Sequence, residues 1–237
     1  MATRNVNDRG NINDKCKIKV CKNGPYLVSG RIPLIKMIIG TDNGGTSVEW
    51  KVSNKYPLKE SYTLCRCGQS KEKPFCDGTH SKANFNGTET GSREPYINRA
   101  KEIIGPVLKL TDDESLCASA RFCHRAGGIW DLVSQKDNPE AIRIAIEEGG
   151  NCPSGTLVVW DKKSGKAMEP DFDWSIILVE DPQVGVSGPL WVRGGIPIES
   201  ADGKVYEVRN RVTLCRCGQS SNKPFCDSSH YPDNIEK

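Results

Sequence analysis

Short stretches of alternating polar and apolar residues, separated by turn formers, run along the chain. Residues Lys17 to Val20 and Ser47 to Val52 alternate in this way, and Lys204 to Val208 does so more loosely. A period of two residues places successive side chains on opposite faces of a sheet, so each segment predicts a strand. The apolar pieces Leu157 to Trp160 and Lys166 to Met168 predict a hairpin across the turn formers between them.

One longer segment has the features of a helix. Asn138 stands before Pro139, which is a favourable helix start, and Ile142 and Ile146 fall on one face. Gly149 then marks the expected stop. The chain is thus expected to contain short strands with few helices.

Composition and charge exclude several classes of protein. No run approaches the roughly 18 apolar residues of a membrane span, and residues 1–14 have neither the apolar core of a secretory signal nor the Arg-rich character of a transit peptide. A net charge of +3 without a basic stripe gives no sign of a nucleic-acid partner. We therefore expect a cytoplasmic protein with no membrane span.

The cysteines point to metal or redox chemistry. There are eleven, an odd count, and no export signal accompanies them. Both facts argue against a disulfide framework and for reduced thiols.

A repeat organises most of these cysteines. Residues 63–80 read TLCRCGQSKEKPFCDGTH and residues 213–230 read TLCRCGQSSNKPFCDSSH, which are identical at fourteen of eighteen positions. A weaker match upstream relates residues 24–33 to residues 188–197, so the first copy carries 14 additional residues, which we place around residues 41–45. The linker-like residues 81–95 and an unrelated segment separate the two copies.

Each copy offers three cysteines and one histidine at short spacing, a donor set that suits zinc or an iron–sulfur cluster. Cys65 and Cys67 have one residue between them, whereas zinc knuckles prefer two to four. Cys76 and His80 stand four apart, so a short helix starting near Asp77, as near Asp227 in the second copy, would bring them together. This spacing favours a cluster, with a structural zinc site as the alternative.

The pattern C-x-C-x2-S-x3-P-x-C-D-x2-H resembles the CDGSH (NEET) iron–sulfur family in both copies. The resemblance implies a 2Fe–2S cluster in each copy, with two cysteines on the inner iron and a cysteine and the histidine on the outer iron. It also implies that two such units pair, which here can occur within one chain or in a homodimer. The implied ligands are Cys65, Cys67, Cys76 and His80, and then Cys215, Cys217, Cys226 and His230.

Two features of the copies leave questions for the structure. Ser228 stands where the first copy has Gly78, and it would be strained if that position needs a positive φ. Basic residues within the motifs either offset the charge of the cluster or form a solvated positive rim; these are Arg66, Lys73, Arg216 and Lys223.

The segment between the copies carries a second signal. Cys117 and Cys123 are followed after 28 residues by Cys152 and a proline, and this spacing resembles single-cluster ferredoxins. Three thiolates suit a 3Fe–4S cluster, or a 4Fe–4S cluster whose fourth iron takes another ligand, with His124 as a candidate. The alternative is a set of buried structural thiols. Cys16 and Cys21 have no partners at ligand spacing, and we interpret them as a half-buried thiol and a strand residue rather than a redox pair.

These features predict an α+β protein in which two small β-rich CDGSH units flank a ferredoxin-like α+β insert. The expected domains are residues 15–90, 96–170 and 175–234. We expect electron transfer rather than enzymatic catalysis, because there is no phosphate loop and no nucleophile–base pair. The partner would be a redox protein, or an apo iron–sulfur acceptor if the chain carries clusters to other proteins.

Overall fold

The computed structural model describes residues 16–136 and 138–232, and it is built from three sheets and few helices. The first repeat forms β1 (Lys17–Val20), β2 (Tyr26–Ser29), β3 (Leu34–Thr41), β4 (Ser47–Lys55), β5 (Ser61–Leu64) and the short helix α1 (Thr79–Lys82). The second repeat forms β9 (Ser175–Asp181), β10 (Val186–Arg193), β11 (Ile198–Glu199) and β12 (Arg211–Leu214). The strands predicted at residues 17–20 and 47–52 are confirmed as β1 and β4.

The two repeats exchange strands. One sheet has the order β11-β1-β2-β5 and the other has the order β12-β10-β9-β3-β4. Thus β11 of the second repeat pairs in parallel with β1, with Ile18 opposite Ile198, and β3 of the first repeat pairs in parallel with β9, with Leu34 opposite Ile176. Apart from β4 the two sheets have equivalent order, so the repeats pair within the chain as an internal pseudo-dimer.

A shared apolar core explains why the strands alternate as they do. Ile18, Val28, Val192, Ile198 and Leu214 are all at most 3% exposed and belong to one cluster, which contains residues of both repeats. Burying this much apolar surface favours the exchanged arrangement, because neither repeat alone covers its inner face.

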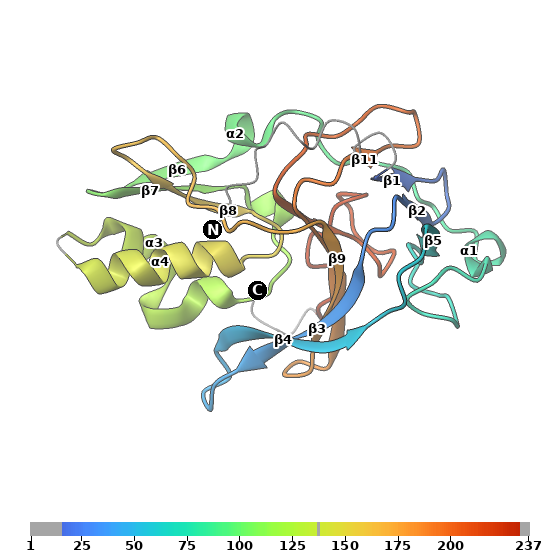
Figure 1. The fold of residues 1–237 in the computed structure, drawn as a ribbon, viewed down its shortest axis with the longest axis horizontal. Coiled ribbons are helices and arrows are strands. Elements are labelled where there is room, and N and C mark those ends of the chain that lie inside the picture. The colour runs from blue at the N-terminus through green and yellow to red at the C-terminus, as the bar shows by residue number, and fades with distance from the viewer. Residues whose placement is uncertain (1–15, 137, 233–237) are drawn as a thin grey trace.

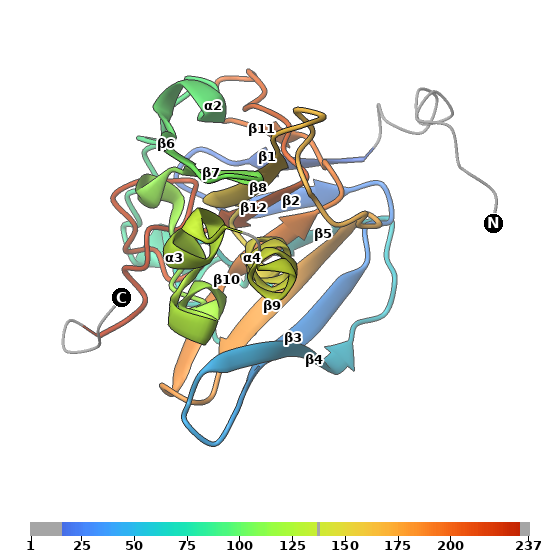
Figure 2. The same ribbon diagram turned by 90° about the vertical axis from the view of Figure 1, so that its left-hand side faces the viewer.

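The insert between the repeats is a separate layer. It contains α2 (Tyr96–Arg99), β6 (Lys101–Ile104), β7 (Leu108–Asp112), α3 (Ile129–Ser134), α4 (Pro139–Asn151) and β8 (Leu157–Asp161). Helices α3 and α4 pack side by side against the sheet β6-β7-β8 and lie at one end of the molecule, while α1 lies at the other end (Figures 1 and 2). The α+β class is confirmed, and the likeness of this insert to ferredoxins stays a prediction.

The additional residues of the first repeat form the β3–β4 hairpin, which turns at residues 42–46. Trp50 on β4 stacks on Phe122 of the insert and on Trp191 of the second repeat, with ring centroids 4.8 and 4.9 Å apart. The extra length therefore joins all three parts of the chain.

The helix predicted from residue 138 is confirmed as α4, but it ends later than predicted, and Gly149 has a different role. The side chain of Asn138 accepts a hydrogen bond from the backbone N–H of Ala141, as an N-cap should. The helix continues past Gly149 to residue 151, and Gly149 lies on its buried face. A β-carbon there would meet Val159 on β8 at 2.7 Å, so glycine permits close packing rather than ending the helix.

The strand predicted at Lys204 to Val208 is wrong. Within that segment Val205 makes a single bridge to Glu199, and Val205 and Val208 are 54% and 52% exposed. The strand forms instead at β12, whose residues Arg211 to Leu214 alternate between polar and apolar but are all buried. The predicted hairpin at residues 157–168 is present as β8 and a bridge between Trp160 and Ala167.

A short helix near the motif aspartates forms in the first repeat alone, as α1, and it begins at Thr79. The carboxylate of Asp77 accepts hydrogen bonds from the backbone N–H groups of Lys71 and Thr79. Asp227 accepts equivalent bonds from Ser221 and Ser229, but a turn follows it.

Some expectations fall outside the described residues, namely those for residues 1–14 and for the outermost positions of the first and third predicted domains. The three domain limits stay predictions. Among the described residues, no helix has the length and apolar character that crossing a bilayer requires.

Arg211 on β12 links the insert to the second repeat. It is 2% exposed and donates hydrogen bonds to the carbonyl oxygens of Cys152 at 2.6 Å and Leu157 at 3.0 Å, and to the carboxylate of Glu169 at 2.7 and 2.8 Å. Burial by itself would raise the pKa of Glu169, but the hydrogen bonds and charge of Arg211 outweigh it and lower that pKa. The ion pair is therefore formed at neutral pH.

Replacing Arg211 by Met should lower the free energy of unfolding by about 3 kcal/mol or more, because Glu169 is left charged without its partner. In the wild type, ionised Glu169 stabilises the folded state fully at a pH above the ordinary pKa of a glutamate. This stabilisation is lost as the pH falls through the lowered pKa of Glu169 in the folded protein. Denaturant melts at pH 7 and pH 3 test this, with Arg143→Met as control. That exposed arginine pairs with Glu140 and Glu147, so its loss should change little. Equal destabilisation by both variants would contradict the prediction.

Candidate metal centres

The first motif begins where β5 ends, and it brings its four donors together as two pairs. The Sγ atoms of Cys65 and Cys67 lie 3.7 Å apart, and Sγ of Cys76 lies 3.3 Å from Nδ1 of His80. Helix α1 carries His80 back toward Cys76. Cys65 and Cys67 are 3% and 4% exposed, whereas Cys76 and His80 are half-buried, so one pair is inside and the other is near the surface.

The second motif repeats the arrangement at the end of β12. The Sγ atoms of Cys215 and Cys217 lie 3.6 Å apart, and Sγ of Cys226 lies 3.5 Å from Nδ1 of His230. Each motif thus places its four predicted donors as two close pairs, and their role as ligands stays a prediction.

This pairing discriminates between the two kinds of centre. Tetrahedral coordination with metal–sulfur bonds near 2.3 Å places two sulfurs on one metal about 3.8 Å apart. The observed pairs approach that separation, but among the described residues no group of three or more Cys, His, Asp or Glu side chains converges on a point where one metal ion would sit. Two donors for each of two metals fit a 2Fe–2S cluster better than four donors for one zinc.

Backbone N–H groups support the charge of the sulfurs. Those of Gln69 and Gly78 donate to Cys67 and Cys76 at 3.5 Å, and that of Gln219 donates to Cys217 at 3.4 Å. Within the second inner pair, donation from Cys217 and from nearby backbone N–H groups lowers the pKa of Cys215, while the same bond and burial raise the pKa of Cys217. These donors stabilise thiolates, the form that binds iron.

The motif arginines are not a solvated rim. Arg66 is 1% exposed and donates to the carbonyl oxygens of Cys21 and Gly87, and its guanidinium lies 5.6 Å from the ring centroid of Tyr26. Arg216 donates to the carbonyl of Val179 and pairs with Glu180 at 3.0 Å. Arg66 therefore holds its motif loop to the turn after β1 and to the linker, and Arg216 holds its loop to β9. Neither alternative raised from the sequence anticipates this role, and compensation of a cluster's charge stays a prediction.

The two motif loops meet back to back. A β-carbon on Gly68 would overlap the carbonyl oxygen of Cys217, and one on Gly218 would overlap that of Cys67. Both glycines have positive φ, of 75° and 82°. Contact between residues next to the inner donors requires glycine in both copies.

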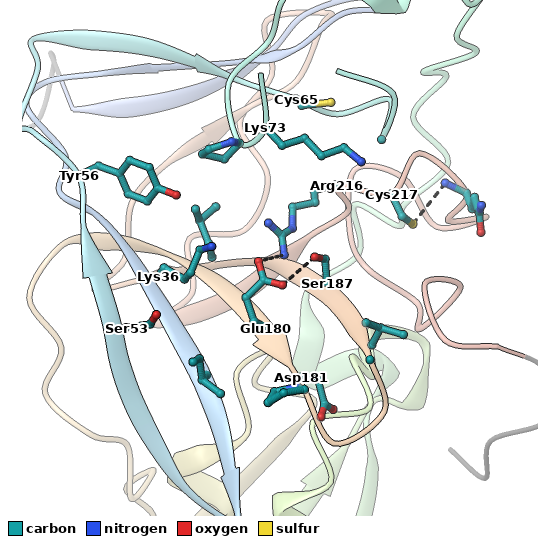
Figure 3. Close-up of a pocket in the computed structure, with 18 residues that line it drawn as sticks. Lys36, Ser53, Tyr56, Cys65, Lys73, Glu180, Asp181, Ser187, Arg216 and Cys217 are labelled. Atoms are coloured by element: carbon teal, nitrogen blue, oxygen red, sulfur yellow. Dashed lines mark hydrogen bonds and ion pairs between the residues drawn. The ribbon is translucent and has the colours of Figure 1, made fainter. Parts of the chain in front are cut away.

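A cavity of about 660 Å³ opens beside these loops. Figure 3 shows Cys65 and Lys73 on one side of it, Arg216 and Cys217 on another, and Lys36 and Tyr56 across from them. Its lining comes from both repeats, so one opening reaches an inner cysteine of each motif.

The middle cysteines also gather around one space. Cys117, Cys123 and Cys152 line a cavity of about 400 Å³, together with the candidate ligand His124. Burial raises the pKa of Cys117 and Cys123, and the charge of the neighbouring Cys152 raises both further. Three thiols that line one roomy cavity fit a cluster better than scattered structural thiols.

One candidate ligand escaped the sequence motifs. Asp112 lines the same cavity at the end of β7, and burial raises its pKa. It accepts a hydrogen bond from Nε1 of Trp130 at 3.1 Å. Nothing in its local sequence separates it from the neighbouring Asp113, which pairs with Arg99 instead.

The remaining cysteines lie apart from these centres. Cys16 is 3% exposed, and its Sγ donates to the carbonyl of Gly30 at 3.1 Å. Cys21 is half-buried and accepts from Arg66 at its carbonyl oxygen. None of the eleven cysteines, all of which lie within the described residues, forms a disulfide.

Ser228 has the positive φ that its counterpart Gly78 suggested, with values of 69° and 84°. Its hydroxyl donates to the carbonyl oxygen of Cys117 at 2.8 Å and accepts from the hydroxyl of Ser119 at 2.7 Å. Hydrogen bonds to the middle segment thus accompany a strained backbone. The sequence flagged this position as a departure but did not indicate its partner.

Replacing Gly68 by Ala should lower the free energy of unfolding by about 2 kcal/mol or more, because the added methyl overlaps the backbone of Cys217. Gly78→Ala is the matched control. It has the same positive φ but no atom within 4 Å of an added β-carbon, so its cost should be the strain of roughly 1 kcal/mol. Thermal melts measure both, and equal losses would show that the two loops do not constrain one another.

Comparisons with known families agree with this geometry. Residues 23–81 and 187–231 match the family model described as iron-binding zinc finger CDGSH type, and residues 103–162 match the one described as divergent 4Fe-4S mono-cluster. Neither the curated proteins nor the solved structures contain a match to the chain. The chain is therefore an iron–sulfur-binding protein with two CDGSH-type regions and a divergent 4Fe-4S region between them.

Proposed function

We propose that the chain is a one-electron transfer protein that holds a 2Fe–2S cluster at each CDGSH motif. The observation that carries this proposal is the division of each donor quartet into two pairs. Cys65 and Cys67 would hold the inner iron of the first cluster, and Cys76 and His80 the outer one. The second motif would do the same with Cys215, Cys217, Cys226 and His230. Such a cluster supplies reversible storage of one electron.

The residues around each pair suit that role. A neutral imidazole in place of a fourth thiolate leaves the site less negative, which favours reduction. The backbone N–H groups of Gln69 and Gly78 do the same by stabilising negative charge on the sulfurs. In the first motif the inner pair is buried and the outer pair is half-buried, so the donors keep water from one side while leaving the other accessible.

We propose a third cluster, 3Fe–4S or 4Fe–4S, at Cys117, Cys123 and Cys152. Three thiolates complete the first form, and the second needs one further ligand. His124 and Asp112 both line the cavity and are the candidates for that place.

A second function, transfer of whole clusters to apo acceptors, is favoured at the first motif by one observation. Cys76 is half-buried, and its neighbours Asp77 and Gly78 are exposed, whereas Cys226 is 2% exposed. An acceptor could therefore reach the outer pair of the first motif more easily than that of the second.

Protein purified without air should contain iron and acid-labile sulfide, with about four irons from two small clusters and about three or four more from the middle site. Cys65→Ser should remove about two of these irons. Cys16→Ser is the matched control, because that thiol is equally buried and lies outside the motifs. A colourless, zinc-containing protein without sulfide would refute the proposal.

Electron transfer and cluster transfer can be told apart by mixing reduced holoprotein with two acceptors under anaerobic conditions. With an oxidised ferredoxin, electron transfer predicts loss of the reduced spectrum while the chain keeps its iron. With an apo-ferredoxin, cluster transfer predicts that iron and sulfide move to the acceptor. If iron leaves the chain and no electrons reach the oxidised acceptor, the primary proposal is wrong.

A further inference from the structure

The middle site adjoins the second CDGSH motif and not the first. Asp227 and Ser228 of the second motif line the same cavity as Cys117, Cys123 and Cys152, and no residue of the first motif does so among the described residues. In Figure 1 the second motif, in red, lies between the insert with α3 and α4 and the end of the molecule that carries α1.

The contacts come from positions where the two motifs differ in sequence. Asn222 donates through its side chain to the carbonyl of Ser115 at 2.8 Å, and Ser228 donates to that of Cys117 at 2.8 Å. Their counterparts in the first motif are Glu72 and Gly78. The two eighteen-residue motifs differ at four positions, and these are two of the four. The sequence differences therefore determine which motif contacts the insert.

A third contact reinforces the selection just beyond the motif. Tyr231 stands where the first repeat has Ser81, and its hydroxyl accepts from Arg121 at 2.6 Å and donates to Asp181 at 2.5 Å. Arg121 also pairs directly with Asp181 at 2.7 Å, and that carboxylate is 1% exposed. A buried charged network of this kind fixes the segment that carries Cys117 and Cys123 against the second repeat.

Ser228 makes the connection between the two sets of donors short. It lies two residues after Cys226, and its hydroxyl bonds to the backbone of Cys117. Two peptide links and one hydrogen bond therefore separate a donor of the second motif from a donor of the middle site. At the first motif, a β-carbon on Gly78 would have no atom within 4 Å.

We propose that the middle centre is coupled to the second CDGSH centre through Ser228, and that the first CDGSH centre is the far end of a three-centre series. The inference rests on the proposed function. Ser228 is a positioning residue, and Asn222 and Tyr231 support it. In the coupled step one electron leaves the reduced centre of the pair and enters the oxidised one, so no bond forms or breaks and no proton moves. The first centre joins the series through the contact of Gly68 with Cys217 and of Gly218 with Cys67.

The repeat supplies a matched pair of variants for the test. Cys76→Ser removes an outer donor of the first motif and leaves the second 2Fe–2S centre, and Cys226→Ser does the reverse. In fully reduced holoprotein, a neighbouring paramagnetic centre speeds the electron-spin relaxation of a reduced 2Fe–2S centre. The microwave power that half-saturates the 2Fe–2S EPR signal should therefore be several-fold higher in C76S than in C226S.

Two controls tie this difference to the contacts. Adding Cys123→Ser removes a donor of the middle site, and the two single-motif variants should then saturate at similar power. The double variant N222E/S228G replaces two residues of the second motif by their counterparts in the first motif, Glu72 and Gly78. In the C76S background it should lower the half-saturation power toward the C226S value while iron content and visible spectrum stay the same.

Equal half-saturation powers in C76S and C226S, with all remaining centres loaded, would overturn the inference. So would an N222E/S228G variant that saturates like its C76S parent. If Cys226→Ser fails to fold, comparison of C76S with and without N222E/S228G decides the question alone. A different result would contradict the proposed function alone: a holoprotein whose centres are coupled but which passes no electron to an oxidised acceptor.

Discussion

The back-to-back contact of the two motif loops is the constraint on which the rest of the structure depends. Gly68 and Gly218 each press against a backbone carbonyl next to an inner donor of the other motif. Such an approach holds only if both loops leave their strands at fixed positions, and the exchange of β3 and β11 between the sheets fixes them. A single repeat would expose both its inner sheet face and its inner cysteines to water.

The two motifs, although nearly identical in sequence, contact different parts of the chain. The linker after the first motif covers the second, since the backbone N–H groups of Thr90 and Gly91 both donate to the carbonyl of Lys223 at 2.7 Å. The equivalent Lys73 instead lines the large cavity beside Cys65. Two sites with the same donor set therefore differ in exposure.

The sequence predicted the local features well, because the chemistry at those places is local. Donors at C-x-C and C-x3-H spacing pair wherever a strand end and a turn follow one another, and Asn138 caps its helix without help from the rest of the chain. Long-range features were less accessible. In residues 204–208 Tyr206 packs into the core while Val205 and Val208 stay exposed, so no strand forms; β12 alternates in sequence as well, yet all four of its residues are buried. Asp112 needed the folded cavity to be distinguished from Asp113.

Arg66 shows why composition is a poor guide to electrostatic role. A cation inside a motif of thiol donors suggests charge compensation, yet its guanidinium donates to two backbone carbonyls and lies near the rings of Tyr26 and Phe85. Arginine suits that place because it keeps its charge when buried and can bridge several acceptors at fixed angles. The position of its positive charge is set by the contacts that anchor the loop. The side chain that looks like a counter-ion in the sequence thus holds in place the loop that carries the inner donors, which ties the fold of the motif to the geometry of its donors.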